Sequence, residues 1–244
     1  TLFPYTTLVR SRWPTCAACP SRCRRAGAAP PDEDSRRLAV IALTNYAAAA
    51  LIMPYDRFRQ AAEASRHDLP LLRARFGVST EQLAHRLTSL NRTGARGIPF
   101  FMVRIDRAGI VSKRFDGEAY PFARYGGTCP RWDVHAADAP DIVLPQLIET
   151  LDERRFLTLA IALPRGDGAR GRQVIALGCE AKHAGRLIHA DGIDIERDDA
   201  VTVGPTCHLC ERRDCPDRAL PPVTRALDLH SYERTASPFP FRRV

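Results

Sequence analysis

The stretch Gly97–Phe115 reads GIPFFMVRIDRAGIVSKRF and differs in character from the chain before it. Its first apolar residues, Ile98–Ile105, are typical of a strand, and Ile110 begins a return strand. Between them lies the turn sequence Asp-Arg-Ala-Gly, with Gly109 at the position that tolerates a positive φ. We therefore predict a β-hairpin over residues 97–115.

Four short helices are predicted before this hairpin, because apolar residues recur there at helical spacing. Ser35, Asp68 and Ser79 are suitable cap residues, and Gly77 is placed to end a helix. The helices are expected at residues 35–53, 54–64, 68–76 and 79–90. The chain is thus expected to be helical in its N-terminal part.

The segment after the hairpin is predicted to be rich in strands. Apolar and polar residues alternate over 142–150 and 156–163, and 173–178 is a further strand, followed by a helix over 180–190. The predicted fold class is therefore α+β, with a helical N-terminal part and an antiparallel, β-rich C-terminal domain. We place a boundary near Tyr120. The chain then divides into residues 1–34, unstructured or artefactual, 35–119 and 120–244.

The composition is that of a globular protein, with 45% hydrophobic and 26% charged residues among 244. No apolar run reaches the roughly 18–20 residues of a membrane-spanning helix. The net charge of +8 comes almost wholly from arginine, because only Lys113 and Lys182 of the 36 basic residues are lysines. A GC-rich genome explains such a bias. A phosphate-bearing partner also explains it, because guanidinium groups bind phosphate in bidentate fashion.

The first residues read TLFPYTTLVRS and look like a translated sequencing adapter, so we expect the true N-terminus to be missing. They lack the basic start and apolar core of a signal peptide. We therefore expect a cytoplasmic chain, in which clustered cysteines more often bind metals or react than form disulfides. Cys16, Cys19 and Cys23 lie in this doubtful N-terminal part.

The strongest chemical cluster is Cys207-x2-Cys210-x4-Cys215. A two-residue spacer lets two thiolates reach one metal ion from a tight turn. Three ligands do not close a structural site, so a fourth would come from Cys179, Cys129, His208 or His183. Zinc, an iron–sulfur cluster and redox-active thiols all stay open, as do cysteines that only pack.

The sequence contains no motif of the common hydrolases or nucleotide-binding enzymes. HExxH, GxxxxGK[ST], GxSxG and GxGxxG are all absent, so we predict no enzyme. The stretch Leu69–Leu90 has the form of a helix-turn-helix, in which Glu81 and His85 would face the DNA. Glu81 would then meet phosphates, and we favour a helical pair that packs on the first two helices.

The N-terminal half resembles the IrrE-like, peptidase-derived domain. NYAAAALIMPYDRF, residues 45–58, is similar to the segment that follows the HExxH helix of that domain. The pattern continues at residues 75–79, 86–87, 97–101, 104–109 and 112–115. The family usually has asparagine where Ile110 stands.

The C-terminal half resembles the sensor domain of the short-chain fatty acyl-CoA regulators, which are Xre-type transcription factors of bacteria. The matching strings are GTCPRWDVH at 127–135, LGC at 177–179 and CHLCERRDCP at 207–216. Family members carry an N-terminal helix-turn-helix, an IrrE-like middle part and this cysteine-containing domain.

The resemblance implies a regulator that senses short-chain acyl-CoA and controls genes of acyl-CoA and fatty-acid metabolism. It also implies DNA binding through an upstream domain missing from this chain, a homodimer and no membrane partner. A GAF-like C-terminal fold is expected by analogy. The cations expected to hold the ligand phosphates are Arg104, Arg107, Lys113, Arg114 and Arg131. A zinc, iron–sulfur or thiol redox sensor is the alternative, and a degenerate metallopeptidase is a weaker one.

Overall fold

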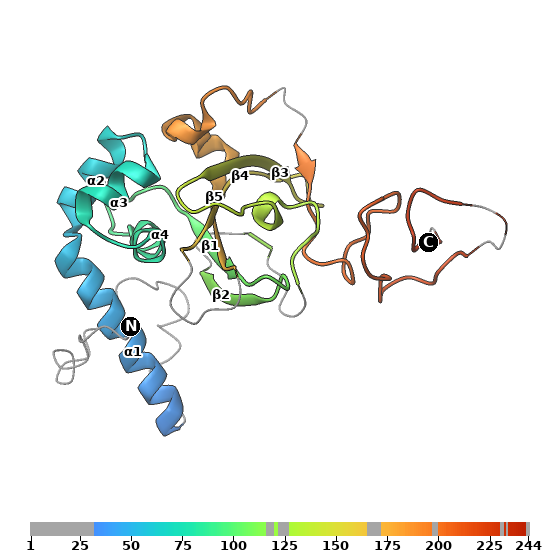
Figure 1. The fold of residues 1–244 in the computed structure, drawn as a ribbon, viewed down its shortest axis with the longest axis horizontal. Coiled ribbons are helices and arrows are strands. Elements are labelled where there is room, and N and C mark those ends of the chain that lie inside the picture. The colour runs from blue at the N-terminus through green and yellow to red at the C-terminus, as the bar shows by residue number, and fades with distance from the viewer. Residues whose placement is uncertain are drawn as a thin grey trace.

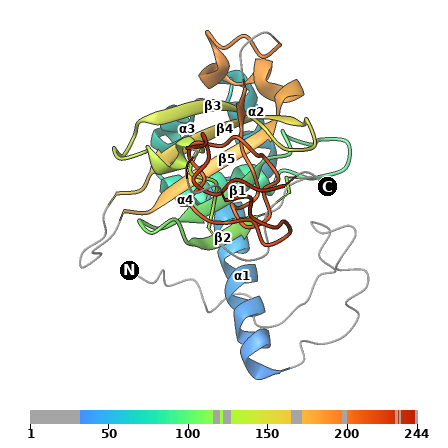
Figure 2. The same ribbon diagram turned by 90° about the vertical axis from the view of Figure 1, so that its right-hand side faces the viewer.

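The computed structural model describes residues 32–115, 120–121, 127–164, 172–196, 200–229, 232 and 234–242. Helices cover one face of a six-stranded sheet, and the C-terminal segment lies on the other side of that sheet (Figures 1 and 2). The α+β class expected from the sequence is confirmed, and the GAF-like comparison stays a prediction.

The helices begin at residues whose side chains cap them. Asp32 accepts a hydrogen bond from the backbone nitrogen of Ser35, and Ser79 and Gln82 form a reciprocal capping box. Gly77 adopts a φ of 60° and ends the third helix. The four helices, all expected from the sequence, are α1 (Glu33–Ile52), α2 (Tyr55–Ala64), α3 (Leu69–Phe76) and α4 (Thr80–Thr88).

The sheet has the strand order β2-β1-β5-β4-β3-β6. Its neighbouring strands pair antiparallel, except that β6 runs parallel to β3. The strands are β1 (Phe101–Ile105), β2 (Val111–Phe115), β3 (Val143–Glu149), β4 (Arg155–Ala162), β5 (Val174–Glu180) and β6 (Val201–Thr202). The two-residue β6 was not expected from the sequence.

The predicted hairpin is the pair β1–β2. The Asp106 carboxylate accepts hydrogen bonds from the backbone nitrogens of Ala108 and Ile110, and Gly109 has a φ of 77°. β1 also pairs with β5 along its whole length. The hairpin therefore shares one sheet with the strands after residue 120, although the sequence analysis grouped it with the helices.

Two hydrophobic cores lie on the two faces of the sheet. Met102 from β1 packs with α2, α3 and α4 in one core, which also takes in Leu177 and Cys179. Phe101 and Val103 from the same strand pack in the other core, beneath the loop around Trp132. The alternation of side chains along β1 thus supplies both cores.

Two expectations need correction. The segment 180–190 was predicted as one helix, but it forms two 3₁₀ helices, η3 (Ala181–Arg186) and η4 (Ile188–Ala190). Gly185 and the extended backbone of Leu187, with a φ of −106° and a ψ of 129°, interrupt a longer helix. Glu33 and Asp34 were assigned to the unstructured part but belong to α1. Residues 1–31, with Cys16, Cys19 and Cys23, lie outside the described residues.

The helix-turn-helix-like pair α3–α4 packs inward, as the sequence analysis favoured. Arg86 of α4 is almost completely buried, and its Nε donates a hydrogen bond to the carbonyl oxygen of Met53 at the end of α1. The Arg86 guanidinium also lies 5.9 and 5.7 Å from the ring centres of Tyr46 and Tyr55. Arg86 therefore joins α4 to the first two helices.

No single helix among the described residues is long and apolar enough to cross a membrane. The pair α1 and α2 meets the length and composition test only when both are counted together, and it is bent by 66°.

A buried histidine connects the helical layer to the segment after β5. His67 and its neighbour Arg66 both have positive φ, and Arg66 forms an ion pair with Asp191. The carbonyl oxygen of Arg66 accepts a hydrogen bond from the backbone of Ile188. Burial lowers the pKa of His67 to about 4, so its ring is neutral near pH 7.

We predict that Gly178→Ala destabilises the protein through a specific clash. A Cβ at Gly178 would lie 2.3 Å from the Cζ of Phe101, which a buried ring cannot accommodate. The expected loss is about 1–3 kcal/mol in urea unfolding. Gly185→Ala, where an added Cβ meets nothing within 4 Å, is the control. The cost should shrink in a Phe101→Leu background, and an undiminished cost there would contradict the assignment.

We predict that His67 makes stability fall as the medium is acidified from about pH 6.5 toward pH 4. The unfolded state binds a proton near pH 6.5, whereas the folded state does so only near the lowered pKa. The contribution of His67 to the free energy of unfolding is therefore fully present above the unfolded-state pKa. It is lost as the pH falls from there toward the folded-state pKa, by at most about 3 kcal/mol. Asparagine tolerates a positive φ, so His67→Asn should fold, and its free energy of unfolding should depend less steeply on pH than that of the wild type. An unchanged slope would refute this role.

Candidate functional site

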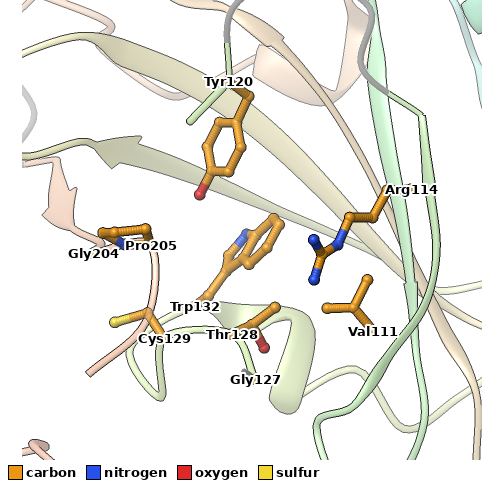
Figure 3. A pocket seen from close by; sticks show the side chains of 9 residues that line it. All are labelled: Val111, Arg114, Tyr120, Gly127, Thr128, Cys129, Trp132, Gly204 and Pro205. Carbon is orange, nitrogen blue, oxygen red and sulfur yellow. The ribbon is translucent and has the colours of Figure 1, made fainter. Parts of the chain in front are cut away.

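A small hollow opens on the sheet face opposite the helices (Figure 3). The Tyr120 hydroxyl and the Arg114 guanidinium both point toward the indole of Trp132. The lining comes from β2, from Tyr120, from the loop that begins at Gly127 and from the segment after β6: Val111, Arg114, Tyr120, Gly127, Thr128, Cys129, Trp132, Gly204 and Pro205. The hollow thus combines an aromatic wall with one cation.

Stacked rings position this aromatic wall. The Tyr120 ring is stacked on Phe101 at 4.4 Å and on Trp132 at 5.8 Å between ring centres. Phe156 of β4 meets the Tyr120 ring edge-on at 5.3 Å. Burial raises the pKa of Tyr120 well above its ordinary value, so the phenol is neutral. The wall is therefore apolar, with one hydroxyl that can hydrogen-bond.

Hydrogen bonds fix the loop that carries Trp132. The indole nitrogen donates to Thr158 Oγ1 of β4 at 3.1 Å. The Gln146 side chain of β3 accepts from the backbone nitrogen of Asp133 at 2.9 Å and donates to the carbonyl oxygen of Arg131 at 3.0 Å. These contacts with two central strands make the hollow a preformed feature of the sheet.

The five basic residues expected to hold the ligand phosphates do not lie together in the structure. Arg114 alone lines the hollow. Arg104 and Lys113 are cross-strand partners on the helical face, and both bind the Glu81 carboxylate of α4. Adjacent residues of a strand point to opposite faces, which places Lys113 and Arg114 on different sides of the sheet.

The other two cations lie away from both positions. Arg107 is exposed in the hairpin turn. Arg131 forms an ion pair with Asp217 of the C-terminal segment, at 2.9 Å between Nη1 and Oδ2. Arg131 therefore holds that segment against the loop that carries Trp132.

The cysteines expected at one site are also divided. Cys129 and Cys210 both lie at Gly204, and the thiols of Cys207 and Cys210 are close enough to Cys129 to influence its pKa. Burial raises the Cys129 pKa above its ordinary value, and backbone hydrogen bonds from Arg131 and Gly204 oppose that rise. Three thiols from two distant parts of the chain therefore converge.

Cys179 lies apart from these thiols, in the core on the helical face. Burial raises the pKa of its thiol to about 12. Cys215 is buried in the C-terminal segment with Cys210. No three cysteine, histidine or carboxylate side chains in the described part of the chain are grouped so that they could hold a metal ion. The described arrangement alone therefore does not form a metal site.

Arg218 is a residue of this region that the sequence analysis missed. It is 3% exposed and donates hydrogen bonds to the carbonyl oxygens of Cys207, Cys210 and Arg212. Its guanidinium also lies 5.2 Å from the ring centre of Phe241. The Arg218 guanidinium thereby holds backbone carbonyl groups of the loop that carries Cys207 and Cys210. No sequence signal distinguished it from the other arginines.

Two family models together match most of the chain. The model described as "Short-chain fatty acyl coenzyme A regulator, C-terminal" matches residues 89–239. The model described as "IrrE N-terminal-like domain" matches residues 22–88. Both resemblances seen in the sequence are confirmed, and the matches meet just before the hairpin rather than near Tyr120.

Curated relatives of the chain are regulators. The propionyl-CoA carboxylase regulator of Cereibacter sphaeroides is 43% identical over 211 residues, which cover 84% of this chain and 46% of the relative. The HTH-type transcriptional regulator RamB of Mycobacterium tuberculosis is 42% identical over 214 residues, covering 84% and 45%. The chain thus spans about half the length of these relatives.

A solved structure described as a Mycobacterium tuberculosis transcriptional regulator is also similar. It superposes with a TM-score of 0.79 at 36% sequence identity, over 85% of this chain and 65% of that chain. The match of the first family model over more than half of the residues shows that this chain belongs to the short-chain fatty acyl-coenzyme A regulator family.

Proposed function

We propose that the chain is the sensor part of a DNA-binding transcriptional regulator that responds to short-chain acyl-CoA. The observation that carries this proposal is the hollow in which Arg114 stands beside Tyr120 and Trp132. In this proposal the regulated genes are those of acyl-CoA and fatty-acid metabolism, and the protein acts in the cytoplasm.

The hollow matches the chemistry of a short acyl thioester. The rings of Tyr120 and Trp132 are stacked on each other and almost completely buried, so an acyl chain of a few carbons would meet only the part of this apolar wall that borders the hollow. The Arg114 guanidinium offers donors to an oxygen of the thioester or of a phosphate. The hollow has room for about one water molecule, so it would have to widen to admit an acyl chain, and a short chain requires less widening than a long one.

DNA recognition is assigned to a domain outside this chain. The second helix of the α3–α4 pair uses Glu81 to bind Arg104 and Lys113, so that residue is not presented to a DNA groove. The relatives are about twice as long as the matched region, and one of them, RamB, is named an HTH-type transcriptional regulator. The full-length regulator is proposed to act as a homodimer.

We predict that the chain binds propionyl-CoA and that Arg114→Gln weakens this binding at least tenfold. A hydrogen bond to a charged group contributes about 1.5–3 kcal/mol, which corresponds to such a factor. Isothermal titration calorimetry of both proteins measures the change. Free coenzyme A should bind less tightly than the thioester, because it lacks the acyl group.

The control for this titration is Arg225→Gln. Arg225 pairs with Glu211 in the C-terminal segment and does not line the hollow. The Arg225→Gln variant should bind propionyl-CoA with the same affinity as the wild type. Absence of heat with any short-chain acyl-CoA would contradict the proposed function, and equal binding by Arg114→Gln would contradict the proposed site.

We propose as a second function that the converging cysteines bind zinc or an iron–sulfur cluster. The supporting observation is that the thiols of Cys207 and Cys210 both lie close enough to Cys129 to influence its pKa. Since the described thiols do not group as a ligand set, the loop from Cys207 to Cys215 would have to close around the metal.

We predict stoichiometric zinc or iron in protein purified without oxygen, measured by elemental analysis and absorbance. Cys210→Ser should lose the metal, because a hydroxyl is a poor ligand for these ions. Cys179→Ser should keep it, because Cys179 lies in the other core. Metal-free wild-type protein, or equal metal content in Cys210→Ser, would refute the metal function.

A further inference from the structure

Glu81 is surrounded by the cations of the hairpin. It lies in the first turn of α4, and Arg104 Nη1 lies 3.0 and 3.1 Å from its two carboxylate oxygens. Lys113 Nζ donates to the same carboxylate at 3.1 Å. Arg104 and Lys113 are register partners on β1 and β2, so one carboxylate from the helical layer holds two neighbouring strands.

The cluster carries an excess of positive charge. Burial opposes ionisation of Glu81, but Lys113 and Arg104 lower its pKa below the ordinary value, so it is an anion. The third ionisable neighbour of Glu81 is His85, whose Nε2 lies 3.9 Å from the Glu81 carboxylate and whose pKa is lowered by burial to about 4. His85 is neutral near pH 7. Among the residues that the structure describes, two cations therefore share one carboxylate.

The donors of this cluster remain within reach of solvent. The side chains of Arg104 and Lys113 are 25% and 40% exposed. Arg104 also donates through its Nε to Ser112 Oγ at 3.0 Å, which holds the guanidinium in place. A phosphoryl group presents the same kind of acceptor oxygens as a carboxylate and carries more charge. It can compete with Glu81 for these donors.

We propose that Arg104 and Lys113 form a phosphate subsite and that Glu81 is its tethered competitor. The proposal rests on the proposed function in that the phosphate belongs to acyl-CoA, which carries a diphosphate and a separate 3′-phosphate. β2 is an edge strand, so Arg114 in the hollow and Lys113 on the helical face are separated only by that strand. One ligand that crosses this edge reaches both faces.

Occupation of the subsite has a consequence for α4. The carboxylate that links α4 to the hairpin is displaced when a phosphate takes its donors. Binding at the sheet is thereby communicated to the helical layer. Glu81 sets both the affinity for the ligand and the strength of this link.

The test compares Glu81→Gln with the wild type in titrations with inorganic pyrophosphate and with propionyl-CoA. The substitution preserves size and removes the competing charge, and unfolding curves verify that the variant is folded. We expect Glu81→Gln to bind both probes about threefold to tenfold more tightly, since each partly exposed ion pair contributes modestly. The gain should vanish in Glu81→Gln combined with Arg104→Gln.

Glu63→Gln is the matched control. Glu63 is similarly exposed and contacts two arginines, Arg59 and Arg186, away from the hairpin. It should bind both probes as the wild type does. Equal or weaker binding by Glu81→Gln, or a gain that survives Arg104→Gln, overturns this inference and leaves the proposed function standing. Tighter pyrophosphate binding without any acyl-CoA binding supports the subsite and contradicts the proposed function.

Discussion

Strand β1 is buried on both faces, and the two hydrophobic cores of the molecule meet across it. Its contact with β5 requires Gly178, because the Phe101 ring occupies the space that a side chain there would fill. The same ring supports Tyr120 in the hollow, while Met102 packs toward the helices. Packing at one strand therefore sets the position of the helical layer and of the hollow together.

The hairpin that begins with β1 also carries basic side chains on both faces of the sheet. Arg114 lies with the aromatic rings of the hollow, and Arg104 and Lys113 lie with Glu81 on the opposite face. A strand with cations on both faces can engage a ligand on one side and a helix on the other. This arrangement gives a physical route by which the proposed binding of a ligand at the sheet would reach the helices that precede it.

The sequence predicted the features that depend on local chemistry. Cap residues, the left-handed Gly77 and the hairpin turn all act through their immediate neighbours, and four helices and the hairpin followed from them. Alternation along the hairpin separates Lys113 from Arg114, but which of the two faces meets the helices depends on packing between distant segments, which the sequence did not predict. For the same reason the sequence did not predict that Cys179 and Cys129 lie in different cores. It also did not predict the role of Arg218, because the hydrogen-bond partners of Arg218 are backbone carbonyl groups, which leave no side-chain pattern in the sequence.

The central claim is that the β1–β2 hairpin and the hollow beside it bind short-chain acyl-CoA. Hydrogen–deuterium exchange with and without propionyl-CoA tests this claim most directly, because it locates the ligand without altering the protein. The account predicts slower exchange in peptides covering residues 101–115 and 127–135, with faster exchange at the start of α4. Protection confined to the C-terminal segment, or no change in the hairpin at saturating ligand, would contradict it.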